Sequence, residues 1–365
     1  MIKQLLVVII LFTQINNLAA QEMPSLPKIF ANSFMFGFGG LNDQIVRKGL
    51  ADPTSPIFNI VTSQSNILSV NCFYPNQVRP KNADFRWGQC SPLMSYAKQF
   101  PDKKLRGHAL LWPSNPQNNL EWLLVDSKGS KVDREEAIKR LRTHIQTVVG
   151  HYKGVFQYWD VLNEVIDPNQ PDGIGASVWK EIIGQQFIDI AFEAAREADP
   201  RAKLFYNDFN EWKPKKREMI YALVKRLKSK GLIDGIGLQQ HVNLFEPTAS
   251  ELDKTISRFA ELGLEIHVTE LDVEVNRNAQ YTELTAELDQ QLAKRYEELF
   301  RTYQKHAGQI TAVMTFNVTD ASSWLRHHPT PHLTWPLLFD AQGKPKTAFW
   351  AIANRGSFST PSASP

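Results

Sequence analysis

Cysteine is scarce in this chain of 365 residues, which has only two, at positions 72 and 90. A small scaffold held together by several disulfides is therefore excluded, because such scaffolds use cysteine far more densely. In an oxidising compartment, Cys72 and Cys90 could form one bridge across a modest loop, and two buried thiols are the alternative. No His or Asp motif accompanies either cysteine, so neither has the surroundings of a catalytic thiol.

The sequence also lacks a strong charge of either sign and a long apolar run. Its net charge is +3, and its densest basic stretch, residues 213–217, opens a predicted helix. A solvated helix face explains such a stretch better than a polyanion site, so we expect no nucleic-acid partner. No segment of the chain reaches the apolar length that a membrane-spanning helix requires, so we expect no membrane partner.

The first 20 residues have the pattern of a secretory signal peptide. Lys3 gives a weakly positive start, residues 5–12 form a short apolar core, and residues 18–20 supply a small-residue cleavage site. We predict a secreted protein, extracellular or periplasmic, whose mature chain starts near Gln21. The Ser/Pro-rich residues 356–365 predict a disordered tail, which leaves residues 21–355 as one domain.

Short β-rich runs alternate with longer helical patterns along this domain. The predicted strands are 35–40, 58–64, 104–111, 158–164, 203–208, 235–241, 265–272 and 312–320. The predicted helices are 134–152, 178–198, 215–230, 249–262 and 285–305, with N-caps at Asp133 and Ser250 and stops at Gly154, Gly231 and Gly263. Eight βα units in a chain of this length predict an α/β fold, a single-domain (β/α)8 TIM barrel.

A doubly wound sheet is the alternative arrangement of βα units. Such a sheet would carry a glycine-rich phosphate loop after its first strand. Residues 36–40 are rich in glycine, but they lack the full spacing and the acidic residue at the expected distance. A tight exit from the first strand explains these glycines better, which favours the barrel.

Two glutamates lie at the polar ends of predicted strands. Glu164 ends the run 158–164, and Glu270 follows Thr269 near the end of the run 265–272. In a parallel barrel, side chains at the C-terminal ends of the strands share one active-site mouth. A retaining glycosidase needs two carboxyl groups ~5–5.5 Å apart, one protonated to assist the leaving oxygen and one ionised to attack the anomeric carbon. We therefore predict that Glu164 and Glu270 are catalytic.

Neighbouring polar residues suit supporting roles around these glutamates. His241, with Asp272 behind it, could hold Glu270 ionised and oriented. Asn163 is placed to bond the sugar hydroxyl next to the reacting carbon. Flat apolar platforms for sugar rings would come from Trp112 and Trp324. A single strand-end glutamate is often a salt-bridge partner and a buried histidine often a core group, so only their joint occurrence indicates catalysis.

The order of these motifs resembles that of the family 10 glycoside hydrolases, whose typical activity is endo-β-1,4-xylanase. The resemblance covers about residues 28–354, and it rests on residues 36–37, 58–62, 106–112, 159–164, 207–210, 237–241, 268–272, 318–324 and 336–340. It implies a retaining hydrolase that cleaves internal β-1,4 linkages of xylan or a related β-linked polysaccharide, with no cofactor.

Carried over position by position, the resemblance makes Glu164 the acid/base and Glu270 the nucleophile. These are the roles that the residues themselves suggest. We assign substrate binding to His108, Trp112, Asn163, Phe209, Gln239, His241 and Trp324. Orientation of the nucleophile is assigned to His241 and Asp272.

The sequence departs from the family pattern after Thr62. There the family usually shows a Glu-Asn pair and then a Lys, which grip the sugar on the non-reducing side of the cleavage site. This chain has Gln64, Ser65 and Leu68 at those positions, although a gap could place Asn66 at the family Asn. Losing polar partners for sugar hydroxyls costs about 1–3 kcal/mol each. We therefore expect an altered glycone pocket, with a decorated or non-xylan β-glycan as the alternative substrate.

Two smaller departures lie near other strand ends. Pro113 follows Trp112 where the family often has a histidine, and residues 316–317 are Phe-Asn where Trp-Gly is common. The competing functional class is a catalytically weak glycan-binding protein on the same scaffold, although such a protein has no need of both carboxylates.

A run of histidines follows the last predicted strand. His327, His328 and His332 lie close to Trp324, and their Pro-interrupted spacing offers no regular metal geometry. We therefore predict a loop that lines the substrate and no metal site. We expect a monomer, and the sequence leaves open whether cleavage is endo or exo.

Overall fold

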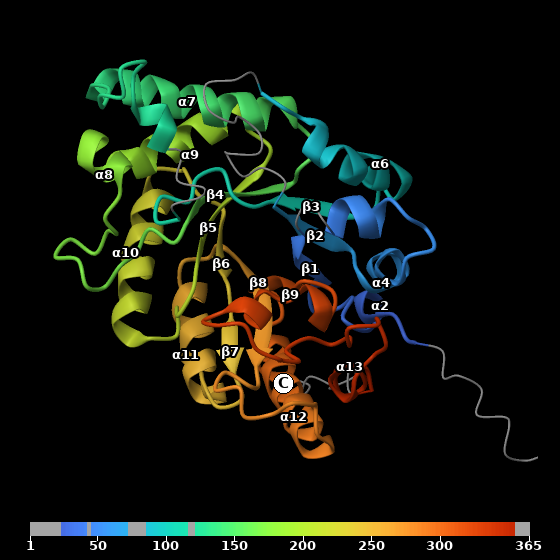
Figure 1. Ribbon diagram of the computed structural model, residues 1–365. Coiled ribbons are helices and arrows are strands. Elements are labelled where there is room, and N and C mark those ends of the chain that lie inside the picture. The colour runs from blue at the N-terminus through green and yellow to red at the C-terminus, as the bar shows by residue number, and fades with distance from the viewer. Residues whose placement is uncertain (1–22, 42–44, 72–84, 116–120, 355–365) are drawn as a thin grey trace, which may run out of the picture.

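The computed structural model describes residues 23–41, 45–71, 85–115 and 121–354. Parallel strands form the centre of the fold, and helices surround them (Figure 1). The sheet order is β6-β5-β4-β3-β2-β1-β9-β8-β7, and an additional pairing between β6 and β8 closes the ring. The predicted (β/α)8 barrel is thereby confirmed.

All strand pairings are parallel, as a βα-alternating sequence requires. The strands are β1 (Met35–Leu41), β2 (Ile67–Val70), β3 (Lys104–Gly107), β4 (Tyr158–Asn163), β5 (Lys203–Asp208), β6 (Gly235–Leu238), β7 (His241–Asn243), β8 (Glu265–Glu274) and β9 (Ile310–Phe316). The short strand β7 follows β6 after two residues and pairs with the outer part of β8, His241 opposite Asp272. The run 235–241, predicted as one strand, is therefore interrupted.

Helices cover the outside of this ring (Figure 1). They are α2 (Leu26–Ile29), α4 (Pro56–Gln64), α6 (Ser91–Gln99), α7 (Arg134–His151), α8 (Val178–Ile183), α9 (Phe187–Ala198), α10 (Pro214–Ser229), α11 (Ala249–Ala260), α12 (Ala286–Lys305) and α13 (Thr347–Ala353). Short helical turns also occur at η1 (Val46–Leu50), η2 (Gly88–Cys90), η3 (Glu121–Leu124), η4 (Asp320–Ser322) and η5 (Trp324–His327). Within the described residues, every helix is too short or too polar to cross a membrane.

The helix boundaries follow local capping chemistry. Asp133 accepts a hydrogen bond from the Glu136 amide, which confirms the predicted N-cap of α7. The N-cap of α11 is Thr248, which forms a capping box with Glu251, so the prediction of Ser250 is wrong by two residues. The predicted helix 178–198 divides into α8 and α9 because Gly184 adopts a left-handed φ of 80° between them.

The prediction of a second strand at 58–64 is wrong, because this stretch is helix α4. Ser55 accepts a hydrogen bond from the Ile57 amide, and Pro56 occupies the first helical position. Phe58, Val61 and Gln64 are buried at a spacing of three residues, which is a helical period. The second strand of the barrel is β2, which begins three residues after α4 ends.

A buried polar network occupies the inside of the barrel. The Arg106 guanidinium forms an ion pair with Asp160, and both side chains are fully buried. Burial lowers the pKa of His267 to about 4, so the ring is neutral and its Nδ1 accepts a hydrogen bond from Arg106 over 2.9 Å. Asp160 Oδ2 also lies 2.9 Å from His108 Nδ1, so this network reaches the strand end after β3.

Candidate active site

Glu164 directly follows the last residue of β4 and has a left-handed backbone, with φ of 56°. In a regular strand, consecutive side chains point to opposite faces. Here the turn at Glu164 brings two consecutive side chains together, since Asn163 Nδ2 lies 3.2 Å from Glu164 Oε1. The Glu164 amide is bonded to the Asn207 carbonyl over 3.0 Å, which fixes this turn against β5.

The carboxyl group of Glu164 is enclosed by neutral donors. Trp112 Nε1 donates to Oε2 over 2.9 Å, and Gln239 Nε2 donates to Oε1 over 2.9 Å. Burial raises the pKa of Glu164 to about 7, and the charges of Asp208 and Glu270 act in the same direction, against these hydrogen bonds. The group is therefore protonated in mildly acidic solution.

Glu270 lies within β8, and it is 6% exposed. Its Oε1 accepts a hydrogen bond from Asn207 over 2.7 Å, and its Oε2 lies 3.2 Å from His241 Nε2. Burial alone would raise the pKa of Glu270, but the His241 hydrogen bond and the charges of His108 and His241 outweigh it and lower that pKa. This carboxyl group is therefore ionised where Glu164 is still protonated.

His241 bridges Glu270 and a second carboxylate. Its Nδ1 lies 3.0 Å from Asp272 Oδ1, as the pairing of β7 with β8 requires. Burial would lower the pKa of His241, but Asp272 and Glu270 raise it to about 10. The ring is therefore an imidazolium that donates to both carboxylates. Trp324 Nε1 donates to the other Asp272 oxygen over 2.8 Å.

Side-chain amides connect the two glutamates. Asn207 Nδ2 lies 2.9 Å from Asn163 Oδ1 as well as 2.7 Å from Glu270. Gln239 Nε2 lies 3.2 Å from the same Asn163 oxygen as well as 2.9 Å from Glu164. This amide chain (Asn163, Asn207 and Gln239) joins one glutamate to the other. Our site prediction omitted Asn207, although its place at the end of a predicted strand was a usable signal.

The remaining predicted site residues divide into two groups. His108 is bonded to Asp160, and its Nδ1 lies 4.0 Å from Glu270 Oε1, so the structure brings it to the glutamate pair. Trp324 also joins the site, with its ring 5.0 Å from that of His241. Phe209 instead packs under the Lys216 ammonium, 3.6 Å from the ring centre, and is 37% exposed. It lies beside Asp208 and outside the amide chain.

Comparison with known proteins identifies this barrel. The family described as glycosyl hydrolase family 10 matches residues 25–355. The chain belongs to this family.

Relatives with known names support the same assignment. An endo-1,4-beta-xylanase of Geobacillus stearothermophilus is 36% identical, with 91% of this chain and 99% of that protein covered. Endo-1,4-beta-xylanase A of Thermotoga neapolitana is 38% identical over 91% of this chain, which spans only 31% of that protein. The crystal structure of xylanase XynB from Paenibacillus barcinonensis, complexed with a conduramine derivative, matches with a TM-score of 0.84 at 33% identity, covering 92% and 99% of the two chains.

The structure corrects the interpretation of the glycone pocket in this family 10 chain. Gln64 accepts a hydrogen bond from the Leu26 amide, and Ser65 donates to the Val61 carbonyl in the last turn of α4. Both residues precede β2 and therefore lie at the N-terminal end of the barrel, opposite the glutamates. Leu68 lies inside β2 and is fully buried.

These three residues therefore do not form a sugar site. The error follows from the misassigned strand at 58–64, which placed the end of the second strand at residue 64, whereas β2 ends at Val70. The C-terminal end of β2 is Val70, followed by Asn71, and residues 72–84 lie outside the described residues.

The histidine loop after η5 only partly approaches the site. The His328 ring lies 4.8 Å from Trp324, whereas His332 Nε2 lies 3.5 Å from Glu274 Oε2. The described residues include no group of three or more His, Cys, Asp or Glu side chains arranged to hold a metal ion.

Cys90 is disulfide-bonded, and the chain's other cysteine, Cys72, lies outside the described residues. The predicted signal segment, residues 1–20, and the tail, residues 356–365, lie outside them as well.

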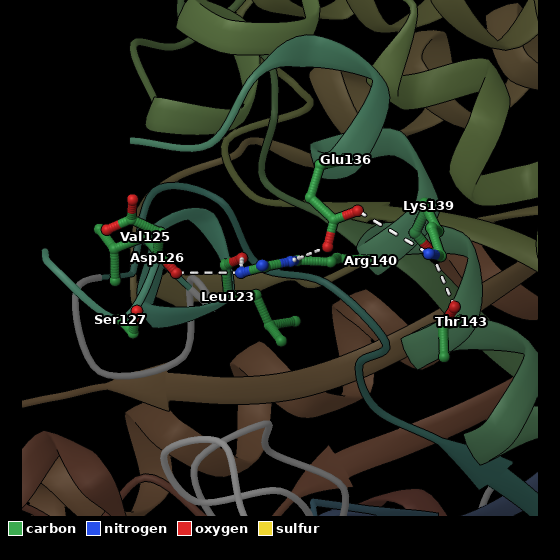
Figure 2. Close-up of a pocket in the computed structure, with 8 residues that line it drawn as sticks. All are labelled: Leu123, Val125, Asp126, Ser127, Glu136, Lys139, Arg140 and Thr143. Atoms are coloured by element: carbon green, nitrogen blue, oxygen red, sulfur yellow. Dashed lines mark hydrogen bonds and ion pairs between the residues drawn. The ribbon is translucent and has the colours of Figure 1, made fainter. Parts of the chain in front are cut away.

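Two surface hollows lie away from the glutamate pair. A hollow of about 430 Å³ lies between η3 and α7, as Figure 2 shows, and is lined by Leu123, Val125, Asp126, Ser127, Glu136, Lys139, Arg140 and Thr143. Arg140 is already bonded there to Glu136 and to two backbone carbonyls. A second hollow, of about 540 Å³, lies at the start of α8. Neither is lined by a residue of the amide chain or by either glutamate.

Proposed function

We propose that this chain is a retaining endo-β-1,4-xylanase, which cleaves internal linkages of xylan or a related β-linked polysaccharide by double displacement. The observation that carries the proposal is the opposite pKa shifts of Glu164 and Glu270, two carboxyl groups joined by one amide chain. Double displacement requires one protonated and one ionised carboxyl group. The family and the names of its relatives supply the substrate class.

In the first step, the ionised Glu270 attacks the anomeric carbon. The bond from that carbon to the glycosidic oxygen breaks, and Glu164 gives its proton to the leaving oxygen. A covalent glycosyl-enzyme forms on Glu270. The imidazolium of His241 and the amide of Asn207 keep Glu270 unprotonated and aligned before the attack.

In the second step, the ionised Glu164 takes a proton from a water molecule. That water attacks the anomeric carbon, the bond to Glu270 breaks, and the configuration at the carbon is retained. Asn163 lies beside Glu164 and can donate its side-chain NH₂ to the hydroxyl next to the reacting carbon. Trp112 is bonded to Glu164 and Trp324 to Asp272, so both indoles lie by the site and can provide flat faces for a sugar ring.

The test is product analysis on unsubstituted xylan, arabinoxylan, glucuronoxylan and other β-glycans. Release of short oligosaccharides from the interior of xylan is expected, and proton NMR of the first products should show the β-anomer. No new reducing ends from any glycan, with wild-type protein that is folded, would overturn the proposal. Preparations of Glu270→Ala purified in the same way control for contaminating hydrolases.

Neither alternative has support from a specific structural observation. A preference for a decorated or non-xylan glycan rested on Gln64, Ser65 and Leu68, which lie away from the glutamates. A glycan-binding protein without turnover would have no use for two carboxyl groups with opposite pKa shifts. The substrate panel separates all three possibilities.

We also propose that the protein is secreted, on the pattern of residues 1–20 alone. N-terminal sequencing of protein recovered from the medium or periplasm should begin near Gln21. Recovery of the full-length chain from the cytoplasm would contradict this.

A further inference from the structure

One short segment of the chain contacts both glutamates. Gln239 and His241 lie on either side of Gln240, where β6 ends and β7 begins. Gln239 donates to Glu164, and His241 donates to Glu270. The relative positions of these two side chains therefore affect the acid and the nucleophile together.

The residue between them has an unusual backbone and a buried side chain. Gln240 has a φ of 59°, which residues with a Cβ rarely adopt, and it is fully buried. The neighbouring backbone is tied at Gln239, whose amide bonds to the Asp208 carbonyl and whose carbonyl accepts from the Glu270 amide. The conformation at Gln240 then determines where His241 begins β7.

Both ends of the Gln240 side-chain amide are hydrogen-bonded to buried side chains of other elements. Its Nε2 donates to Glu211 Oε1, and its Oε1 accepts from the Tyr303 hydroxyl over 3.2 Å. Glu211 follows β5, and Tyr303 belongs to α12, so two separate elements hold one side chain. Both are fully buried. Neither touches Glu164 or Glu270 through any hydrogen bond among the described residues.

The carboxyl group of Glu211 contacts Gln240 through one oxygen. Its Oε1 accepts from Gln240 Nε2, and its Oε2 has no hydrogen-bond partner among the described residues. Burial raises the pKa of Glu211 to about 7, against the hydrogen bonds from its own backbone amide and from Gln240 and against the positive charge of Lys216. The negative charge of Asp208 acts in the same direction as burial. The Glu211 oxygen that accepts from Gln240 can be replaced by the side-chain oxygen of an amide of the same shape.

We propose that Glu211 and Tyr303 are positioning residues for catalysis, which act through Gln240 to set the placement of Gln239 against Glu164 and of His241 against Glu270. This inference rests on the proposed hydrolase function, but its structural part concerns hydrogen bonds that exist whether or not the protein turns over.

The test compares four variants: Glu211→Leu, Glu211→Gln, Tyr303→Phe and Tyr96→Phe. Tyr96 is the matched control, because its buried hydroxyl also makes one side-chain hydrogen bond, to Thr62, on the other side of the barrel. Glu211→Leu should lower kcat on xylo-oligosaccharides about tenfold, with KM changed less than about twofold. Glu211→Gln should recover most of the loss. Tyr303→Phe should lower kcat in the same direction by a smaller factor.

The pH profile of kcat/KM separates positioning from a general loss of structure. Gln239 and His241 lower the pKa of Glu164 and of Glu270, respectively. Loosening both should raise both pKa values, so both limbs of the profile should move to higher pH in Glu211→Leu and Tyr303→Phe. Tyr96→Phe should lower the melting temperature without moving either limb.

Carbon-13 NMR titration of the glutamate carboxyl groups gives the same readout without turnover. Raised pKa values of Glu164 and Glu270 in Glu211→Leu or Tyr303→Phe support the proposal even if no glycan is cleaved, in which case only the proposed function fails. Unmoved limbs and unmoved carboxyl titrations in both variants would overturn it. Failure of Glu211→Gln to recover activity that Glu211→Leu loses would overturn it as well. If Glu211→Leu does not fold, Tyr303→Phe decides the question.

Discussion

Asn207 Nδ2 lies 2.7 Å from Glu270 Oε1 and 2.9 Å from Asn163 Oδ1. One NH₂ group thus joins Glu270, on β8, to the residue beside Glu164. The orientation of this side-chain amide is fixed, because the Thr269 hydroxyl donates to Asn207 Oδ1 over 2.7 Å. The two halves of the site are therefore held in register by a neutral amide, whose hydrogen bond also helps to lower the pKa of Glu270.

Glu270→Ala should lower kcat on xylan by about 10,000-fold or more, because no other carboxylate can form the covalent intermediate. Steady-state release of reducing sugars measures the loss. Glu274→Ala is the control, since Glu274 ends the same strand and bonds instead to Asn276 and Thr334. Comparable losses in the two variants would contradict a specific role for Glu270.

Glu164→Ala should lower kcat on xylan by about 100- to 10,000-fold, the range of general acid catalysis. An aryl glycoside with a good leaving group needs little protonation, so formation of the glycosyl-enzyme from it should be far less affected. In the wild type, the basic limb of the pH profile should lie near 7, because Glu164 must be protonated. Removal of Glu164 should abolish that limb. Equal losses on both substrates would contradict the assignment.

His241→Gln should move the acidic limb of the pH profile to higher pH. The imidazolium lowers the pKa of Glu270, and a neutral amide in its place lets that pKa rise, so more acid-side activity is lost. We expect kcat at the optimum to fall roughly tenfold. The basic limb, which reports Glu164, should move less. A profile with an unmoved acidic limb would show that His241 does not tune the nucleophile.

Arg106→Met should destabilise the fold by about 3–5 kcal/mol, because it removes the guanidinium from buried Asp160 and leaves that carboxylate only its contact with His108. Urea unfolding at neutral pH measures the change. The matched control is Arg258→Met, which breaks a partly exposed pair with Glu218 and should cost less than about 1 kcal/mol. Similar losses in the two variants would mean that buried Asp160 does not need the Arg106 guanidinium.

The triple change Gln64→Glu, Ser65→Asn and Leu68→Lys, which would restore the family's glycone residues if the strand at 58–64 were correct, should not raise activity on unsubstituted xylan. It should lower stability by several kcal/mol, chiefly because Leu68→Lys buries an unpaired ammonium inside β2. Thermal unfolding and xylan hydrolysis measure the two effects. A rise in activity would return these residues to the sugar site.

The error at residues 58–64 shows where sequence patterns become ambiguous. Apolar residues in this short stretch fit both a buried strand and a helix face, and the deciding signal was the Ser55-Pro56 start of a helix. A strand of four residues, such as β2, contains too few alternating positions for its place and register to be predicted from the sequence. Because of this one misplaced strand, Gln64, Ser65 and Leu68 were assigned to the mouth of the barrel. The first two in fact precede β2, and Leu68 is buried inside it.

The amino-acid sequence by itself determined the barrel and the identity of its two glutamates. The alternation of strands with helices, and the polar residues at strand ends, are local patterns that can be recognised without the tertiary structure. It also paired His241 with Glu270 and Asp272, since all three belong to neighbouring strand ends. The residues also suggested that Glu270 is ionised and that Glu164 is the acid, but only the tertiary structure supplies the physical cause of the difference between their pKa values. Burial raises the pKa of Glu164 against the hydrogen bond from Gln239, whereas the imidazolium of His241 and the amide of Asn207 lower the pKa of Glu270. These groups come from strands far apart in the sequence and act only over hydrogen-bond distances.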